Sequence, residues 1–176
     1  MPPADTETTR TRLLDATSAA LARYGPRKLS LTDIATIAGV SRPTVYRHFA
    51  SKDDLLLALS AHEKQRFGAE MAAAIDGLTG TPRLDRALRF IVEFQHDYAM
   101  RGLVVIEPAF MLEQLERALR TMASALIPLF ETATDDDVTA ADLADLVVRV
   151  ALSHFLIRGD DAQLLRELRH VAGIRR

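Results

Sequence analysis

The sequence contains no cysteine, which excludes disulfide bonds and cysteine-ligated metal sites. A chain without thiols also fits a reducing compartment, so we expect a cytoplasmic protein. No apolar stretch approaches the ~20 residues of a membrane-spanning helix, and the first residues, MPPADTETTRTR, include no apolar signal region. The sequence therefore predicts neither a membrane span nor a secretion signal.

Catalytic signatures are also missing. The sequence has no Gly-rich phosphate loop, no G-x-S-x-G motif and no cysteine nucleophile. The pairs His62-Glu63 and His96-Asp97 are the only histidine–carboxylate neighbours, and adjacent residues on a helix point in different directions. Neither histidine has a second histidine four residues further on, as a helical metal site would need. We therefore expect no enzyme, no metal and no cofactor.

The chain has little net charge, but its charges are unevenly distributed. The formal net charge is −2. Residues 1–50 contain seven basic and four acidic residues, whereas the remainder contains 15 basic and 20 acidic residues. This asymmetry predicts a basic N-terminal end on an acidic body, which favours nucleic-acid binding by the N-terminal end.

The segment from Ser30 to Phe49 predicts two short helices joined by a tight turn. Ser30 and Asp33 have the spacing of a capping box, so a helix should begin at Leu31. Gly39 should end that helix because glycine tolerates a positive φ. Ser41 should then cap a second helix that runs to Phe49. Two helices joined in this way form a helix-turn-helix, whose second helix enters the DNA major groove.

The second helix has one buried and one exposed side in this prediction. Val45 and Phe49 are four residues apart and should pack against the first helix. Arg42 should read base edges, because a guanidinium can bond guanine O6 and N7 together. Tyr46 and His48 are typical phosphate donors. The side chains predicted to be available to DNA are Arg42, Thr44, Tyr46, Arg47 and His48, with Lys52 following at the positive end of the next helix.

Five short motifs occur in register between residues 13 and 56. They are Tyr24-Gly25, Ile34-Ala35, Gly39-Val40-Ser41, Tyr46-Arg47-His48-Phe49 and Lys52-Asp53-Asp54-Leu55. This stretch resembles the DNA-binding domain of the tetracycline-repressor-like (TetR) transcriptional regulators. Two features depart from the family pattern: Val45 stands where leucine is usual, and the N-terminal arm lacks a basic cluster.

The resemblance implies a role for each matching residue. It places Thr32, Arg42, Pro43 and Thr44 near bases, and Ser30, Tyr46, His48 and Lys52 on phosphates. It also implies a helix-turn-helix domain over residues 1–51 and a ligand-binding and dimerisation domain over residues 52–176. The complete predicted DNA-binding set is Ser30, Thr32, Ser41, Arg42, Pro43, Thr44, Tyr46, Arg47, His48 and Lys52.

The rest of the chain also has helical periodicity, which predicts an all-α protein: a three-helix N-terminal domain joined by a long helix to a C-terminal helical domain. No strand pattern and no internal repeat occurs. Apolar spacing and terminal Gly, Pro and capping residues predict helices over residues 6–24, 52–76, 81–102, 108–128, 140–158 and 161–171, with an acidic loop around Asp135.

Large adaptable side chains concentrate in residues 67–130, and this clustering indicates a ligand site. Methionine-rich surfaces can repack around varied guests. Gln95, His96 and Tyr98 could supply the polar contacts of such a site. The alternative is a plain core, with no ligand. The predicted ligand-binding residues are Phe67, Met71, Phe90, Phe94, Tyr98, Phe110, Met111 and Met122.

The helix predicted over residues 140–158 is apolar around almost its whole circumference. A helix of this kind must be buried on all sides, and a small domain seldom encloses one. We expect one side to face a second copy about a two-fold axis. The alternative is a central helix in a monomer. The predicted dimer residues are Leu143, Val147, Val148, Ala151, Leu152, Phe155, Leu164 and Leu168.

These observations predict a sequence-specific DNA-binding transcriptional regulator. We expect a homodimeric repressor that a small apolar ligand releases from a palindromic, inverted-repeat operator on double-stranded DNA. The alternative is a helix-turn-helix DNA-binding protein or activator with no small-molecule inducer. The sequence names neither the operator, the target genes nor the ligand.

Overall fold

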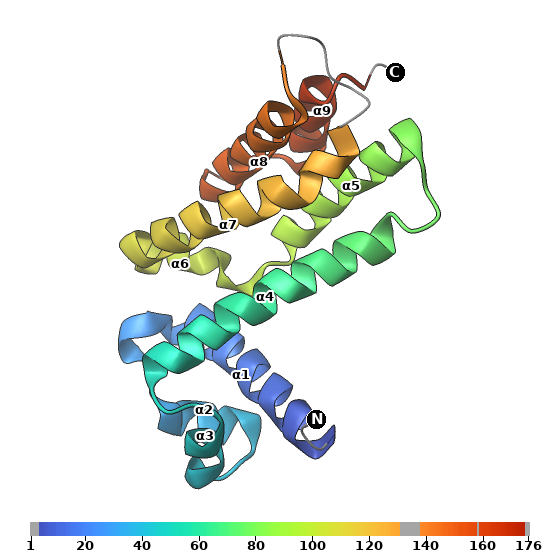
Figure 1. The fold of residues 1–176 in the computed structure, drawn as a ribbon. Coiled ribbons are helices and arrows are strands. Elements are labelled where there is room, and N and C mark those ends of the chain that lie inside the picture. The colour runs from blue at the N-terminus through green and yellow to red at the C-terminus, as the bar shows by residue number, and fades with distance from the viewer. Residues whose placement is uncertain (1–3, 131–137, 158, 175–176) are drawn as a thin grey trace. The chain divides into compact units, whose positions relative to one another are not determined.

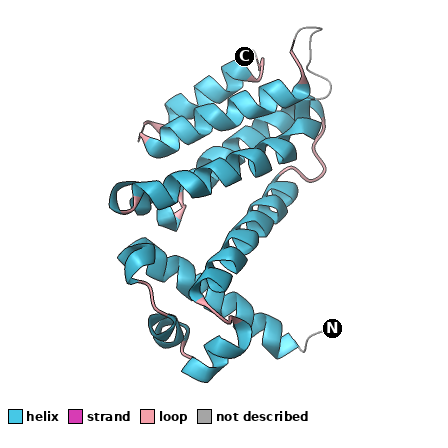
Figure 2. Ribbon diagram, turned by 60° about the vertical axis from the view of Figure 1, so that its left-hand side comes forward, coloured by secondary structure: helices cyan, strands magenta, loops and turns pink. Residues whose placement is uncertain are grey.

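The computed structural model describes residues 4–130, 138–157 and 159–174, and no strand occurs in these ranges (Figures 1 and 2). The helices confirm the predicted all-α class. In chain order they are α1 (Ala4–Lys28), α2 (Leu31–Ala38), α3 (Arg42–His48), α4 (Lys52–Ala74), α5 (Gly80–His96), the 3-10 turn η1 (Ala99–Gly102), α6 (Leu103–Ile106), α7 (Pro108–Phe130), α8 (Ala140–Leu156) and α9 (Asp161–Val171).

Several boundaries differ from the predicted ones. The backbone leaves the helical conformation at Gly25 (φ 72°, ψ 166°), so the predicted end of the first helix is correct and a short turn of helix follows it. The fifth helix ends at His96, so Tyr98 lies beyond it, where a helix was predicted to continue. The loop around Asp135 and the last predicted residue of α8, Arg158, lie outside the described residues.

The chain packs as two compact units. The first comprises residues 1–63 and 99–112, and the second comprises residues 64–98 and 113–176. Helices α4 and α7 therefore contribute to both. These units are defined by packing, so the functional boundary between residues 51 and 52 stays a prediction.

The core of the first unit is apolar and continuous from α1 to the start of α4. Helices η1 and α6 pack against α1, and Glu107, which follows α6, forms an ion pair with Arg27 at 3.3 Å. Buried core residues of this unit include Leu13, Leu14, Leu21, Ile34, Val45, Phe49, Leu55 and Leu103.

In the second unit α8 packs against α9 and α5, and residues of α4 and α7 belong to the same apolar core. Polar pairs add to its apolar core: Arg169 with Asp85 and His96 with Asp161 join α5 to α9. His154 bonds Glu167 at 2.7 Å between Nε2 and Oε2 and so joins α8 to α9. The largest fully buried residues here are Leu88, Ile91, Leu126, Phe130 and Leu168.

Candidate nucleic-acid interface

Helix α2 begins at Leu31 because Ser30 and Asp33 satisfy each other's free donors. Asp33 N donates to Ser30 Oγ at 3.1 Å, and Ser30 N donates to Asp33 Oδ2 at 3.2 Å. This reciprocal pair is the predicted capping box, and the structure confirms it. The inner side of α2 carries Ile34, Ala35 and Ala38, which are all buried, while Thr32 is exposed at the first turn.

The turn after α2 depends on Gly39, whose φ of 64° and ψ of 38° are left-handed. Its backbone N–H bonds the last turn of α2, and Arg12 donates from Nη2 to the carbonyl of Ala38 at 2.7 Å. Ser41 then caps α3, because its Oγ accepts from Thr44 N at 3.3 Å. These bonds satisfy the N–H groups of Gly39 and Thr44 and the carbonyl of Ala38, and they help to fix the direction in which α3 leaves the turn.

Helix α3 separates its packing side from its exposed side. Val45 is 0% exposed and Phe49, just after the helix, is 1% exposed, as predicted. Arg42, Pro43 and Arg47 are exposed, and Tyr46 is 47% exposed. Thr44 is half-buried and shares a 2.8 Å hydrogen bond with Ser41. The exposed side is thus cationic and rich in donors, which suits a polyanion.

Arg42 and Tyr46 form a pair on that exposed side. They are one helical turn apart, the Arg42 guanidinium carbon lies 5.6 Å from the ring centroid of Tyr46, and Nη2 lies 3.4 Å from the tyrosine hydroxyl. Stacking on an aromatic ring restricts the directions in which the guanidinium can point. Arg42 is therefore held at the first turn of α3, where a recognition helix contacts base edges.

His48 is less accessible than predicted. Its side chain is half-buried, and Nε2 is buried without a hydrogen-bond partner among the described residues. Burial lowers the pKa of His48, and the nearby charges of Arg47 and Arg10 lower it further. Arg10 is placed by packing over the ring of Phe49, 5.5 Å from its centroid. The surroundings of the imidazole therefore favour its neutral form in the free protein.

Lys52 begins α4 and is half-buried. Its ammonium group donates to the backbone carbonyl of Pro26. Ser51 caps the same helix end, with Oγ accepting from Asp54 N at 3.0 Å. Asp54 in turn accepts from Ala50 N at 3.0 Å, so both residues help to begin α4. The bond to Pro26 ties the start of α4 to the end of α1.

The predicted ligand-binding residues do not all belong to one unit. Phe67, Phe90 and Phe94 contact one another with ring centroids 5.1–5.7 Å apart, and Tyr98 stacks on Phe94 at 6.0 Å. Met71 is buried and Met122 half-buried in the same unit. Phe110 and Met111 belong to the other compact unit. The aromatic side chains therefore form one packed series in the second unit, without Phe110.

The structure corrects the side of α8 and α9 that was assigned to a second copy. Six of the eight residues are enclosed in the core of the single chain: Val147, Val148, Ala151, Phe155, Leu164 and Leu168. Leu143 and Leu152 are half-buried. The exposed large apolar residues at α8 and its end are instead Leu146, at 46%, Leu156, at 38%, and Ile157, at 80%. A pattern that is apolar all round cannot tell the inner side from the outer one, and this is why the assignment failed.

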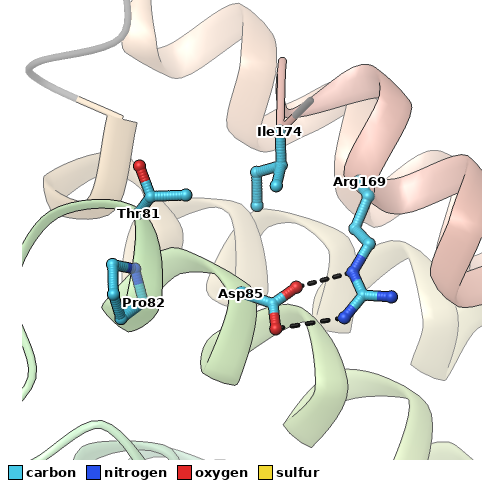
Figure 3. Close-up of a pocket in the computed structure, with 5 residues that line it drawn as sticks. All are labelled: Thr81, Pro82, Asp85, Arg169 and Ile174. Atoms are coloured by element: carbon cyan, nitrogen blue, oxygen red, sulfur yellow. Dashed lines mark hydrogen bonds and ion pairs between the residues drawn. The ribbon is translucent and has the colours of Figure 1, made fainter. Parts of the chain in front are cut away.

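One polar site was missed entirely by the sequence patterns. Arg169 and Asp85 lie beside Thr81, Pro82 and Ile174 at a surface pocket of about 490 Å³ (Figure 3). The two residues are 84 positions apart, and no local spacing signals such a pair. Within the described ranges no group of three His, Asp or Glu side chains could hold a metal ion, and no helix is long and apolar enough to cross a membrane.

The fold and the helix-turn-helix together define a DNA-binding transcriptional regulator. Residues 13–59 match the family model described as bacterial regulatory proteins, tetR family. The helix-turn-helix segment of the chain therefore matches this family, as its motifs predicted.

Relatives and solved structures agree with this assignment. The HTH-type transcriptional repressor LfrR of Mycolicibacterium smegmatis is 38% identical over 108 residues, which are 61% of this chain and 54% of LfrR. The chain therefore spans about half the length of that relative. The uncharacterized HTH-type transcriptional regulator Rv1255c of Mycobacterium tuberculosis is 28% identical over 159 residues, 89% of this chain and 79% of its own. A TetR-like regulator from Rhodococcus sp. RHA1 has the same fold, with a TM-score of 0.68 at 23% identity over 98% of this chain and 96% of that chain.

Proposed function

We propose that this regulator binds an inverted-repeat operator as a homodimer and represses transcription until a small apolar molecule releases it. The observation that carries the DNA-binding part is the division of α3 into a buried side, at Val45, and an exposed cationic side, at Arg42 and Arg47. The repressor name of LfrR, the relative aligned over 108 residues, supports the sign of regulation. The alternative is an activator, or a DNA-binding protein without an inducer.

Each predicted DNA-binding residue of the helix-turn-helix domain has a proposed role. Arg42, stacked on Tyr46, reads a base edge, and Thr32, Pro43 and Thr44 approach bases beside it. The phosphate-binding residues are Ser30, Ser41, Tyr46, Arg47, His48 and Lys52. Because the ammonium of Lys52 already bonds the Pro26 carbonyl, a phosphate there must share or replace that bond. The head is residues 1–51, and residues 52–176 bind ligand and dimerise.

The proposed dimer uses the exposed line of α8 and not its buried side. Leu146 and the half-buried Val150 are one turn apart on α8, and the exposed Ile157 follows directly after the helix end. The half-buried residues Leu143 and Leu165 flank them. A two-fold interface presents each of these residues twice, so a short apolar line makes a larger joint surface.

The proposed ligand site is the aromatic series of Phe67, Phe90, Phe94 and Tyr98 in the second unit. These aromatic rings, together with the side chains of Met71 and Met122, form apolar surroundings that can repack around a ligand. We place the function in the cytoplasm, with DNA as the macromolecular partner and no cofactor or catalytic step.

The test is selection from a random duplex library with the purified chain. We expect an enriched inverted repeat whose half-sites are separated by about one helical turn, or a little more. Affinity for that duplex, measured by fluorescence anisotropy, should fall steeply with salt because phosphate contacts release counterions. A library that yields no palindrome, together with salt-independent binding, would contradict the proposal.

A further inference from the structure

The last turn of α5 carries a buried amide with an unused donor. Gln95 is 7% exposed, and its Nε2 is buried without a hydrogen-bond partner in the part of the chain that the structure describes. Its backbone carbonyl is occupied, since it accepts from the N–H of Tyr98 at 3.4 Å. Only the side-chain amide is therefore left unsatisfied. Buried polar groups in proteins are nearly always bonded, so this one needs a physical reason.

The surroundings of Gln95 are apolar. Leu84, Leu88 and Ile91 precede it at helical spacing and are all buried, so Gln95 extends the core-facing side of α5 by one turn. The aromatic series of the proposed ligand site ends within one turn of it, because Tyr98, which stacks on Phe94, donates its backbone N–H to the Gln95 carbonyl. An apolar residue would pack here without loss, so the amide destabilises the free protein.

We propose that Gln95 is the polar anchor of the ligand site, and that the ligand is a neutral apolar molecule carrying a carbonyl oxygen. This inference rests on the proposed function and narrows its ligand class. The unused N–H groups of Nε2 would donate to the carbonyl, while the aromatic series contacts the hydrocarbon part. A carboxylate fits less well, because the nearby cation, Arg66, already lies 4.9 Å over the Phe94 ring and pairs with Glu70.

The first experiment measures the stability of Gln95→Met in the full chain without ligand. Methionine has nearly the same length and shape but no donor, so removing the unsatisfied amide should raise Tm by about 2–4 °C. The control is Gln65→Met, which makes the same change at an exposed position of α4 and should leave Tm unchanged. A fall in Tm for Gln95→Met would show a structural role for the amide and overturn the proposal.

The second experiment compares ligands that differ only in the acceptor. Straight-chain methyl ketones and n-alkanes of matched heavy-atom number, at several medium chain lengths, are titrated into the chain by calorimetry. For the best length we expect the ketone to bind the wild type about tenfold more tightly than the alkane, as one buried hydrogen bond allows. Gln95→Met should lose that difference and keep its affinity for the alkane, whereas Gln65→Met should retain the difference. Gln95→Leu serves if the methionine variant does not fold.

The outcomes separate this inference from the proposed function. Equal binding of ketones and alkanes overturns the role of Gln95, and so does binding of neither series. Release of a selected operator by both series alike would leave ligand-controlled DNA binding intact while Gln95 loses its role. Ketone binding that depends on Gln95 but never releases DNA would support the anchor and contradict induced release.

Discussion

The guanidinium of Arg169 in α9 holds the carboxylate of Asp85 in α5 through two hydrogen bonds. Nε donates to Oδ1 at 2.6 Å and Nη2 donates to Oδ2 at 3.1 Å (Figure 3). The hydrogen bonds from Arg169 are the main cause that lowers the pKa of Asp85 to about 2. A bidentate, largely buried pair of this kind links the first turns of α5 to the last turns of α9.

The Asp85–Arg169 pair should make the free energy of unfolding fall at acidic pH. Because the pKa of Asp85 falls from 3.8 to about 2 on folding, its contribution is present above pH 3.8 and is lost as the pH falls towards 2. That contribution amounts to at most about 2 kcal/mol. Asp85→Asn should therefore lower the free energy of unfolding at neutral pH by about 2 kcal/mol and flatten its acid dependence, as urea melts at several pH values would measure. The control is Asp145→Asn, whose partner Arg149 is well exposed, and it should have little effect. Equal losses from both variants would refute this view of the pair.

Two glycines should respond in opposite directions to alanine. Gly25 has φ 72° and ψ 166°, a combination that is nearly exclusive to glycine, and a Cβ there would lie 3.3 Å from Cγ of Glu107. Gly25→Ala should cost about 1–3 kcal/mol of stability. Gly68 lies inside α4 with open space around it, so Gly68→Ala should add about 0.5–1 kcal/mol. Thermal melts of both variants measure these changes in stability. If Gly25→Ala left Tm unchanged, the turn at Gly25 would be able to relax around the added methyl group.

Arg42→Ala should relax base preference in DNA binding. We expect one position in each half-site to lose discrimination by about 1–3 kcal/mol, because a bidentate base contact is removed. Lys52→Ala should instead weaken binding to all sequences alike and reduce the salt slope by about one unit. Arg120→Ala, at an exposed arginine of α7, is the control and should change neither quantity. Repeated library selection with each variant measures the preference, and uniform weakening by Arg42→Ala would make Arg42 a phosphate contact.

Substitutions on opposite sides of α8 should separate assembly from folding. Leu146 is 46% exposed in the single chain, so Leu146→Glu should yield folded monomers with weakened operator binding. Val148 is 0% exposed, so Val148→Glu should unfold the second unit. Sedimentation at low micromolar concentration together with circular dichroism distinguishes the two outcomes. A Leu146→Glu variant that remains dimeric would place the interface elsewhere.

The local features of this chain were predictable because their causes lie within a few residues. The capping box at Ser30 formed as predicted, and the same motif begins α8 at Thr139, each with its aspartate three residues on. Val45 and Phe49 are buried because four-residue spacing places them on one side of α3 and its end. The family motifs predicted the fold of this segment for the same reason: most of them mark a turn or a helix end, and Ile34-Ala35 marks the buried side of α2.

Features that depend on distant contacts were not predictable. Which side of α8 faces the core is decided by α5, α7 and α9, and the apolar residues of α8 itself surround its axis. The Asp85–Arg169 pair and the unsatisfied amide of Gln95 also arise only when helices far apart in sequence pack together. The bond from Lys52 to the Pro26 carbonyl has the same origin. None of these has a spacing or composition signal.

The separation of sides on α3 affects how this head can change over evolutionary time. Folding uses Val45 and the adjoining Phe49, whereas Arg42, Pro43 and Arg47 lie outside the core. Exchanges at exposed positions usually alter stability by less than about 0.5 kcal/mol. A duplicated copy of this regulator can therefore drift towards a new operator without first losing its fold, and engineered libraries confined to those three positions should return mostly folded proteins.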